Sequence, residues 1–130
     1  MKKAVADSTL SKLWSRAVVA YYGSCPITGR SDGLHAHHIV GKGRQNRFSL
    51  RWDIRNGIPL APEVHRAYHD GDLKIEKQIL DYVEMRGDIE YLMSLKYMLK
   101  HEFLLHIGKT EDEYRLYLKK YLSSLIEEYT

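Results

Sequence analysis

The feature that most constrains this chain is a cluster of histidines between residues 35 and 70. Five of the seven histidines lie there, as His35, His37, His38, His65 and His69. The last two are four residues apart, which places both rings on one face of a helix. His37 and His38 are adjacent, so on an extended strand one can reach a metal while its neighbour reaches a water. This pattern favours a metal-dependent hydrolase.

Composition indicates a globular protein. With 130 residues, 44% of them hydrophobic and 28% charged, the chain can bury a core, and we expect a single domain over residues 1–130. The single cysteine, Cys25, excludes an internal disulfide and fits a reducing compartment. No signal peptide and no apolar run of membrane-spanning length is present, so we expect a cytoplasmic protein without a membrane partner.

Charge is distributed unevenly along the chain. Residues 1–60 contain ten Lys and Arg against three Asp and Glu, a net +7, whereas residues 61–130 contain ten against fourteen, a net −4. A basic half that also carries the histidines suits a polyanionic substrate. The residues expected to contact successive phosphates are Lys42, Arg44, Arg47, Arg51 and Arg55. The alternative is a chance asymmetry with a solvated loop that binds nothing.

Hydrophobic spacing and turn residues predict the secondary structure. The first half should form a helix over 8–22, capped by Asp7 or Ser8, then strands over 34–40 and 58–60 and a helix from Pro62 to the stop at Gly71. Three further helices should follow: 73–86, one from a cap at Asp88 to Gly108, and one opened by a Thr110–Glu113 capping box. Pro59 should place its strand at an edge, and Trp14 and Cys25 should be buried.

Three motifs, in this order, resemble the HNH (ββα-metal) endonuclease family. They are His37-His38-Ile39, Asn56-Gly-Ile-Pro-Leu60 and His65-x-x-x-His69. The resemblance covers residues 25–70, and Leu50–Asn56 also looks like the phage recombination-nuclease branch of NinG or Rap type. It implies an α+β fold, with a ββα-metal motif embedded in a mainly α-helical single domain. The expected parts are an N-terminal helix (1–24), the HNH core (25–71) and a C-terminal helical extension (72–130).

The resemblance also implies roles for single residues. His38 resembles the general base, since an imidazole titrates close to neutral pH. His37, His65 and His69 resemble the ligands of one divalent ion, which could be Mg²⁺, Mn²⁺, Ni²⁺ or Zn²⁺. Asn56 resembles the residue that braces the loop between the strands and so orients His38. His35 shares a strand face with His37, so either could be the first ligand, and we favour His37.

Many members of that family carry a structural zinc held by two Cys-x-x-Cys pairs. The corresponding positions here are Cys25, Thr28, Ala61 and Val64. With three of the four ligands missing, no structural zinc is expected. Ala61 and Val64 should instead pack as apolar replacements.

The resemblance therefore implies a metal-dependent endonuclease that hydrolyses double-stranded or branched DNA to 5′-phosphate ends. The expected role is phage or prophage recombination or DNA processing. If the protein is phage-encoded, it would act in the host cytoplasm. A homodimer or a phage recombination partner is a further hypothesis. A second hypothesis is a non-catalytic or partner-activated DNA-binding module of nuclease-like fold. A third is a nuclease that acts on RNA, because phosphate contacts do not distinguish the two nucleic acids.

Overall fold

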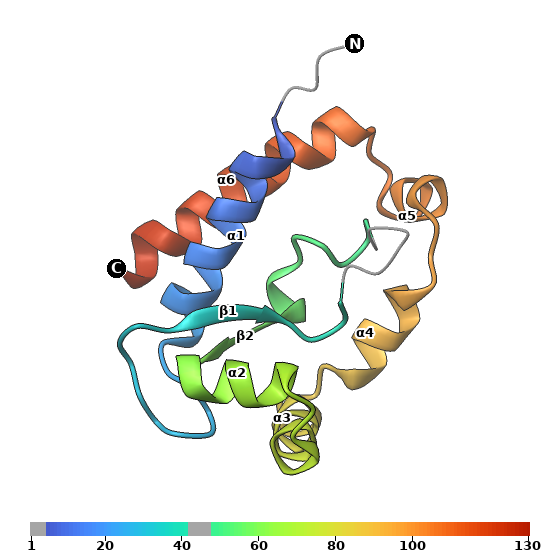
Figure 1. Ribbon diagram of the computed structural model, residues 1–130. Helices are drawn as coiled ribbons and strands as arrows, with labels where there is room; N and C mark the ends of the chain where they lie inside the picture. Colours follow the sequence, from blue (N-terminus) through green and yellow to red (C-terminus); the bar gives the residue numbers. More distant parts are fainter. Residues whose placement is uncertain (1–4, 42–47) are drawn as a thin grey trace.

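A computed structural model describes residues 5–41 and 48–130, and in these residues helices surround one two-stranded sheet (Figure 1). The elements are α1 (Asp7–Tyr22), β1 (His35–His38), a short 3₁₀ turn η1 (Ile54–Asn56), β2 (Gly57–Leu60), α2 (Pro62–His69), α3 (Leu73–Arg86), α4 (Ile89–Lys96), α5 (Lys100–Ile107) and α6 (Glu111–Tyr129). The expected α+β class is confirmed, and β1, β2 and α2 form the ββα unit. Within the described ranges, no helix has both the length and the apolar character needed to cross a membrane.

The sheet lies between two helices. Strands β1 and β2 are antiparallel, with His37 opposite Ile58 and His38 opposite Gly57. Helix α1 contacts both strands, and α2 contacts β1. Because side chains alternate along a strand, His37 faces α2, where its ring meets that of Tyr68, and His38 faces α1. The hairpin therefore delivers its two adjacent histidines to different surroundings.

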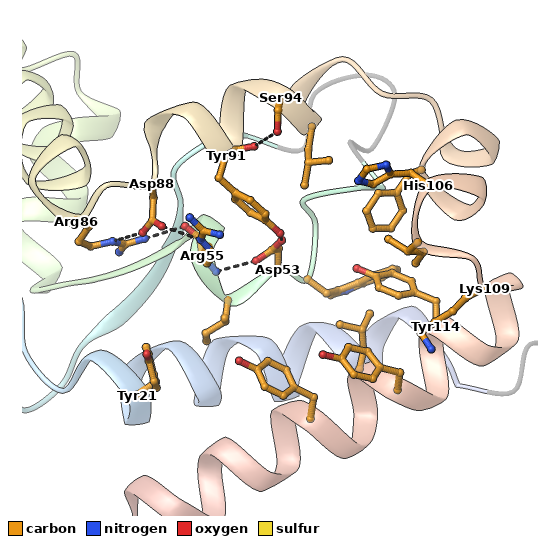
Figure 2. A pocket seen from close by; sticks show the side chains of 18 of the residues that line it. Tyr21, Asp53, Arg55, Arg86, Asp88, Tyr91, Ser94, His106, Lys109 and Tyr114 are labelled. Carbon is orange, nitrogen blue, oxygen red and sulfur yellow. Dashed lines mark hydrogen bonds and ion pairs between the residues drawn. The ribbon is translucent and has the colours of Figure 1, made fainter.

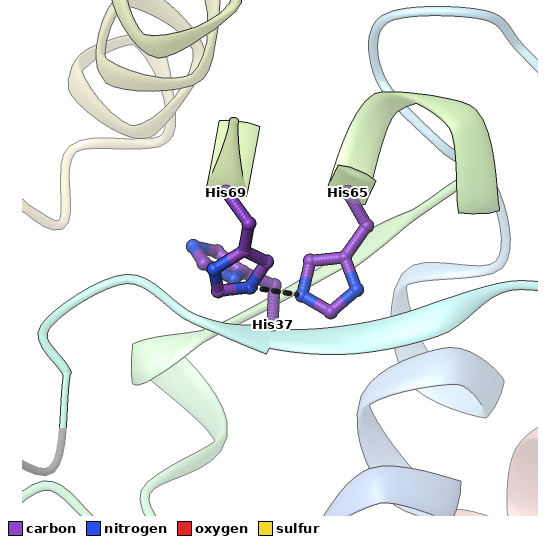
Figure 3. Close-up of side chains that lie close together, drawn as sticks. All are labelled: His37, His65 and His69. Carbon is purple, nitrogen blue, oxygen red and sulfur yellow. Dashed lines mark hydrogen bonds between the residues drawn. The ribbon is translucent and has the colours of Figure 1, made fainter. Parts of the chain in front are cut away.

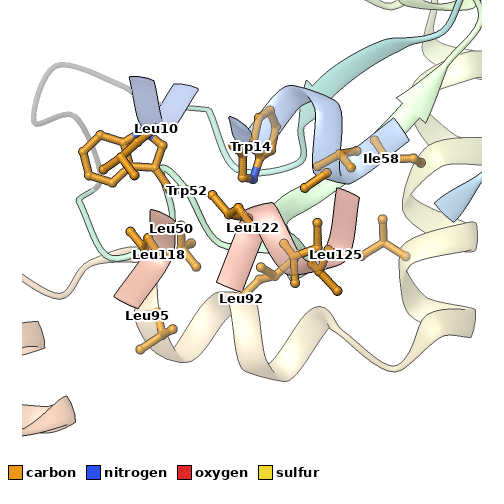
Figure 4. Packing of buried hydrophobic residues seen from close by; sticks show 14 of the residues in the cluster. Leu10, Trp14, Leu50, Trp52, Ile58, Leu92, Leu95, Leu118, Leu122 and Leu125 are labelled. Atoms are coloured by element: carbon orange, nitrogen blue, oxygen red, sulfur yellow. The ribbon is translucent and has the colours of Figure 1, made fainter. Parts of the chain in front are cut away.

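The core joins the two ends of the chain. Helices α1 and α6 lie side by side (Figure 1), and their apolar faces bury Leu10, Trp14 and Leu122. Leu50 and Trp52, from the segment before η1, pack into the same cluster (Figure 4). The expected burial of Trp14 is confirmed. The same holds for Cys25, Ala61 and Val64, which are 0%, 0% and 4% exposed.

Several predicted helix ends are confirmed. Helix α1 stops at Gly23, whose φ of 79° is left-handed, a conformation that glycine adopts without a Cβ clash. Helix α3 has the expected bounds, with the Asp72 carboxylate accepting hydrogen bonds from two amides of its first turn. Helix α6 opens with the predicted capping box, in which the Thr110 hydroxyl and the Glu113 side chain each bond the other residue's amide.

Two predicted caps differ from the structure. The N-cap of α1 is Ala6 rather than Asp7 or Ser8, and Asp88 stands at the N-cap of α4 without a side-chain capping bond. Neither Asp7 nor Asp88 makes a side-chain capping hydrogen bond at its helix. The Asp7 carboxylate lies 2.7 Å from the guanidinium of Arg115, a side chain only 2% exposed. The Asp88 carboxylate pairs with Arg55 at 2.7 Å and Arg86 at 2.8 Å. An ion pair with a sheltered guanidinium joins two full opposite charges, whereas a terminal amide offers only a partial one, so both carboxylates bond arginines instead of the helix ends.

The single helix predicted from Asp88 to Gly108 is also wrong, because it is divided into α4 and α5. Tyr97 leaves helical geometry, and Leu99 is extended with its amide bonded to the Glu102 carboxylate. The change of direction lets Leu95 of α4 and Phe103 of α5 both enter the core, where Phe103 meets Phe48. No glycine or proline marks this break, so tertiary packing overrides a continuous helical pattern.

Gly57 is where α1 comes closest to the hairpin. A Cβ at this position would lie 2.3 Å from Cγ2 of Val18 and 3.2 Å from Cζ2 of Trp14. We expect Gly57→Ala to lower the free energy of unfolding by about 2–3 kcal/mol, because the crowded helix must shift. Urea denaturation measures the change. At Gly41 an added Cβ meets no atom of the described residues within 4 Å, so Gly41→Ala is the matched control. Equal stabilities for the two variants would contradict the packing described.

Candidate metal centre

Three histidine rings converge between α2 and β1. Pro62 stands at the start of α2 and Gly71, with a φ of 85°, follows its end, so the helix is short and presents His65 and His69 on one face. That face meets His37 of β1 (Figure 3). One ring nitrogen from each histidine lies within 4.8 Å of the others, and the Nε2 atoms of His65 and His69 are 3.0 Å apart. The structure therefore brings together the three ligands expected from the sequence.

His37 is in an environment that fits a metal ligand. Its side chain is 7% exposed, and Nε2 is buried without a hydrogen-bond partner among the described residues. An unpaired buried ring nitrogen is unfavourable unless something binds to it. Burial, with smaller contributions from the neighbouring His65, His69 and His38, lowers the pKa of His37 to about 4. The ring is therefore neutral at physiological pH, the form that binds a metal.

The donor set limits the choice of metal. Burial and the nearby His69 and His35 also lower the pKa of His65, so this ring too favours the neutral form. Three imidazole ligands suit zinc, nickel, cobalt and similar ions, whereas magnesium prefers oxygen ligands. Three protein ligands also leave coordination positions for a water and a phosphate oxygen, as in catalytic sites. The residues present thus fit a single divalent ion.

His35 contacts the cluster from outside it. Its Nδ1 lies 3.2 Å from Nδ1 of His65, on the opposite edge of that ring from the nitrogen that faces His69. A hydrogen bond there requires one ring to donate and the other to accept. If His65 donates, its Nε2 keeps the lone pair that a metal needs. His35 is thus placed to orient a ligand, and His37, rather than His35, completes the cluster of three.

We expect His35→Ala to weaken divalent-metal binding about tenfold without abolishing it, because His65 loses the partner that fixes its orientation. A competition titration of the chelated protein with Zn²⁺ or Ni²⁺ measures the affinity. His101→Ala changes an exposed histidine of α5 outside the cluster and should leave the affinity unchanged. A loss as large as that of His69→Ala would make His35 a ligand, and no change would remove it from the site.

His38 is fixed on the other face of the hairpin. Its Nε2 lies 2.9 Å from the backbone carbonyl of Arg51, and its ring stacks on Trp14 with centroids 3.9 Å apart and planes 8° from parallel. Since a carbonyl only accepts, Nε2 carries the hydrogen and Nδ1 keeps its lone pair. That tautomer can take a proton at Nδ1, as a general base must. The sequence pattern did not indicate either contact.

Asn56 connects the two segments that hold His38. It is fully buried; its Oδ1 accepts from the amide of Val40 at 2.8 Å, and its Nδ2 donates to the carbonyls of Val40 and Leu50 at 3.0 and 3.2 Å. Val40 follows His38 by two residues, and Leu50 precedes the Arg51 carbonyl that His38 binds. The side chain thus ties the end of β1 to the segment that fixes the imidazole, the bracing expected of Asn56.

The expected phosphate-contacting residues are only partly described. Lys42, Arg44 and Arg47 lie outside the described residues. The guanidinium of Arg51 pairs with Asp7 at 3.3 Å, and that of Arg55 pairs with Asp88 and lies 3.7 Å above the Tyr91 ring. Both arginines are therefore engaged within the protein, and their contact with DNA stays a prediction.

Comparison with known proteins identifies the segment that contains this geometry. Residues 25–76 match the family model of the HNH endonuclease. The match supports the HNH family. It spans every histidine of the cluster, Asn56 and the whole ββα unit. It does not support the narrower NinG or Rap branch. Searches of the curated proteins and of the solved structures found no match.

Proposed function

We propose that this protein is a metal-dependent HNH endonuclease that hydrolyses DNA phosphodiester bonds. One observation carries the proposal: within the segment that matches the HNH family, ring nitrogens of His37, His65 and His69 converge within 4.8 Å beside a separately held His38. Nε2 of His37 is buried and has no hydrogen-bond partner among the described residues, which distinguishes this ring from ordinary surface histidines.

In this proposal His38 is the general base. The carbonyl of Arg51 holds the hydrogen on Nε2, so Nδ1 accepts the proton of the water that attacks the phosphorus. Stacking on Trp14 and the Asn56 bracing keep the ring in place, which lowers the cost of orienting it for the reaction. The bond from phosphorus to the 3′ oxygen then breaks and leaves a 5′-phosphate end.

His37, His65 and His69 would hold one divalent ion. When bound, such an ion stabilises the negative charge that develops on the phosphate and on the leaving oxygen. Mn²⁺, Ni²⁺ and Zn²⁺ match the imidazole ligands best, and Mg²⁺ should bind more weakly.

Substrate positioning is assigned to basic residues near the cluster. We propose that Lys42, Arg44 and Arg47 contact phosphates on either side of the scissile bond. Arg51 and Arg55 are included because their side chains, although paired, stay partly exposed, at 16% and 43%. Such contacts predict cleavage that weakens steeply as salt concentration rises.

The phage setting is the narrower part of the proposal. It depends on the resemblance of Leu50–Asn56 to the phage recombination nucleases. A role in recombination would favour branched DNA over linear duplex, and a second copy of the chain or a phage protein would be its partner. The alternative function is a non-catalytic or partner-activated DNA-binding module, which would use the same basic surface.

End-labelled oligonucleotides test the proposal. Linear duplex DNA, a four-way DNA junction and a structured RNA are each incubated with the protein, with and without Mn²⁺ or Ni²⁺. The expected result is metal-dependent cleavage of DNA whose products can be religated, which requires 5′-phosphate ends. Binding of DNA without cleavage of any substrate would favour the non-catalytic module, and cleavage confined to RNA would favour the third hypothesis.

A further inference from the structure

A second candidate site lies on another part of the molecule. An open cavity of about 900 Å³ is bordered by η1 and the residues just before it, the ends of α1 and α3, and helices α4, α5 and α6 (Figure 2). None of the histidines of the metal centre lines it. We call it the tyrosine cavity because six tyrosines line it: Tyr21, Tyr22, Tyr91, Tyr114, Tyr117 and Tyr121. Its volume is in the range of sites that bind small molecules.

Two polar groups of the cavity have hydrogen-bonding capacity left. The Asp53 carboxylate accepts from the Arg55 amide and the Tyr91 hydroxyl, which leaves a lone pair on each oxygen. The Tyr114 side chain is 6% exposed and lines the cavity, and its hydroxyl makes no hydrogen bond with another described residue. Burial raises the pKa of Tyr114, so its hydroxyl keeps the proton and can donate. An acceptor and a donor thus border the same space.

The charges of the lining favour an anionic ligand over a cationic one. Arg55, Arg86 and Lys109 outnumber the carboxylates of Asp53 and Asp88, for a net charge of +1. The guanidinium groups of Arg55 and Arg86 lie 3.7 and 4.4 Å from the ring centroids of Tyr91 and Tyr22. Because a guanidinium already lies over the ring of Tyr91 and another over that of Tyr22, these two ring faces are not available to a cationic ligand.

The wall formed by α6 offers aromatic surface to a flat ligand. The rings of Tyr117 and Tyr121 are 5° from parallel, with centroids 5.8 Å apart. Lys109 places its ammonium 5.6 Å from the Tyr117 ring, at the exposed end of the cavity. Aromatic side chains stack on unpaired nucleobases, and a lysine beside them can contact the phosphate.

We propose that the tyrosine cavity binds a nucleotide through an unpaired base that has adjacent ring N–H and amino donors, as guanine does. Two adjacent donors on the base match the two oxygens of Asp53. The Tyr114 hydroxyl donates to an acceptor of the base, the α6 tyrosines cover its face, and Lys109 contacts the phosphate. The same chemistry fits a free nucleotide or an unpaired nucleotide within a strand. This site is independent of the proposed cleavage reaction and needs no metal.

Isothermal titration of the chelated protein with guanosine 5′-monophosphate tests the proposal. We expect saturable binding with one site per chain, and binding of thymidine 5′-monophosphate about tenfold weaker, because thymine lacks the amino donor. Asp53→Asn and Tyr114→Phe should each weaken guanosine monophosphate binding about tenfold. Lys109→Ala should weaken the monophosphate but not guanosine. Tyr97→Phe alters an exposed tyrosine outside the cavity and should have no effect.

Competition distinguishes the two sources of the ligand. A single-stranded oligonucleotide that displaces guanosine monophosphate, when the matched duplex does not, assigns the cavity to an unpaired nucleotide of a strand. No displacement assigns it to a free nucleotide. Circular dichroism verifies that each variant is folded, and Tyr114→Phe, which removes a single oxygen, serves if Asp53→Asn unfolds.

Absence of saturable binding by any nucleoside monophosphate at millimolar concentration would overturn the proposal. So would binding that is unchanged in both Asp53→Asn and Tyr114→Phe. Metal-dependent cleavage is measured separately on the same preparations. A protein that cleaves DNA without binding guanosine monophosphate loses only this inference, and one that binds it without cleaving DNA loses only the proposed function.

Discussion

His38→Ala is expected to reduce metal-dependent DNA cleavage about a thousandfold while leaving metal affinity unchanged. The reason is geometric: the imidazole lies on the opposite face of β1 from His37, so its loss removes the proton acceptor and none of the three converging nitrogens. General bases contribute between about a hundredfold and ten-thousandfold to rates. Nicking rates at saturating Mn²⁺, measured with a parallel metal titration, give the two quantities.

Two variants serve as controls for this prediction. His69→Ala should lose metal affinity and cleavage together, because it removes one of the three histidines proposed to hold the ion. His101→Ala, in an exposed position of α5, should change neither. Cleavage by His38→Ala within a few-fold of the unaltered protein would exclude His38 as the base. A parallel loss of metal affinity would show that its role is structural.

Asn56→Ala is expected to have the largest effect on stability together with a loss of cleavage. The substitution leaves the part-buried amide and carbonyl of Val40 without their Asn56 partner, and the carbonyl of Leu50 keeps only its bond from the amide of Asp53. Three hydrogen bonds are lost and two groups are left unsatisfied at about 1–3 kcal/mol each, so the free energy of unfolding should fall by about 3 kcal/mol or more. Because Leu50 precedes the carbonyl that fixes His38, cleavage should fall even under conditions where the variant is folded.

Ser49→Ala is the matched control for Asn56→Ala. Ser49 is equally buried, but its hydroxyl donates its hydrogen bond to the carbonyl of Leu95 in α4 rather than to the segments that hold His38. We expect a loss of about 1 kcal/mol and an unchanged cleavage rate. Urea denaturation and nicking assays on both variants separate the two effects. If Asn56→Ala loses stability but cleaves normally when folded, the bracing of His38 is not needed for the reaction.

The local pattern of the chain predicted the ββα unit because its signals are short-range. Alternation predicts His37 and His38 on opposite faces, and the spacing of His65 and His69 places both on one face of α2. The motif predicts a bracing role for Asn56 but not its partners, Val40 and Leu50. Each of these depends on residues close in sequence and on the period of one element.

The features that could not be predicted from the sequence depend on contacts between residues that are far apart in the chain. Trp14 stacks on a residue 24 positions later, and nothing in the apolar stripe of α1 distinguishes this role from ordinary burial. The missing side-chain caps at Asp7 and Asp88 have the same origin, because the arginines that pair with these two carboxylates come from other elements. The division between α4 and α5 follows from where Phe103 packs. The sequence leaves His35 and His37 as alternative first ligands. In the structure His35 contacts His65 at Nδ1, on the opposite edge of that ring from the nitrogen that faces His69.

Dependence of cleavage on the histidine cluster is tested most directly with supercoiled plasmid and the chelated protein, with single divalent metals added back. We expect no nicking without metal, nicking when Mn²⁺, Ni²⁺ or another suitable divalent ion is supplied, and no recovery by any metal in His69→Ala. Nicking that persists after chelation, or that His69→Ala retains, would contradict a reaction dependent on the histidine cluster. A protein that binds metal at His37, His65 and His69 but cleaves neither plasmid nor branched DNA would contradict the assignment as a nuclease active on its own.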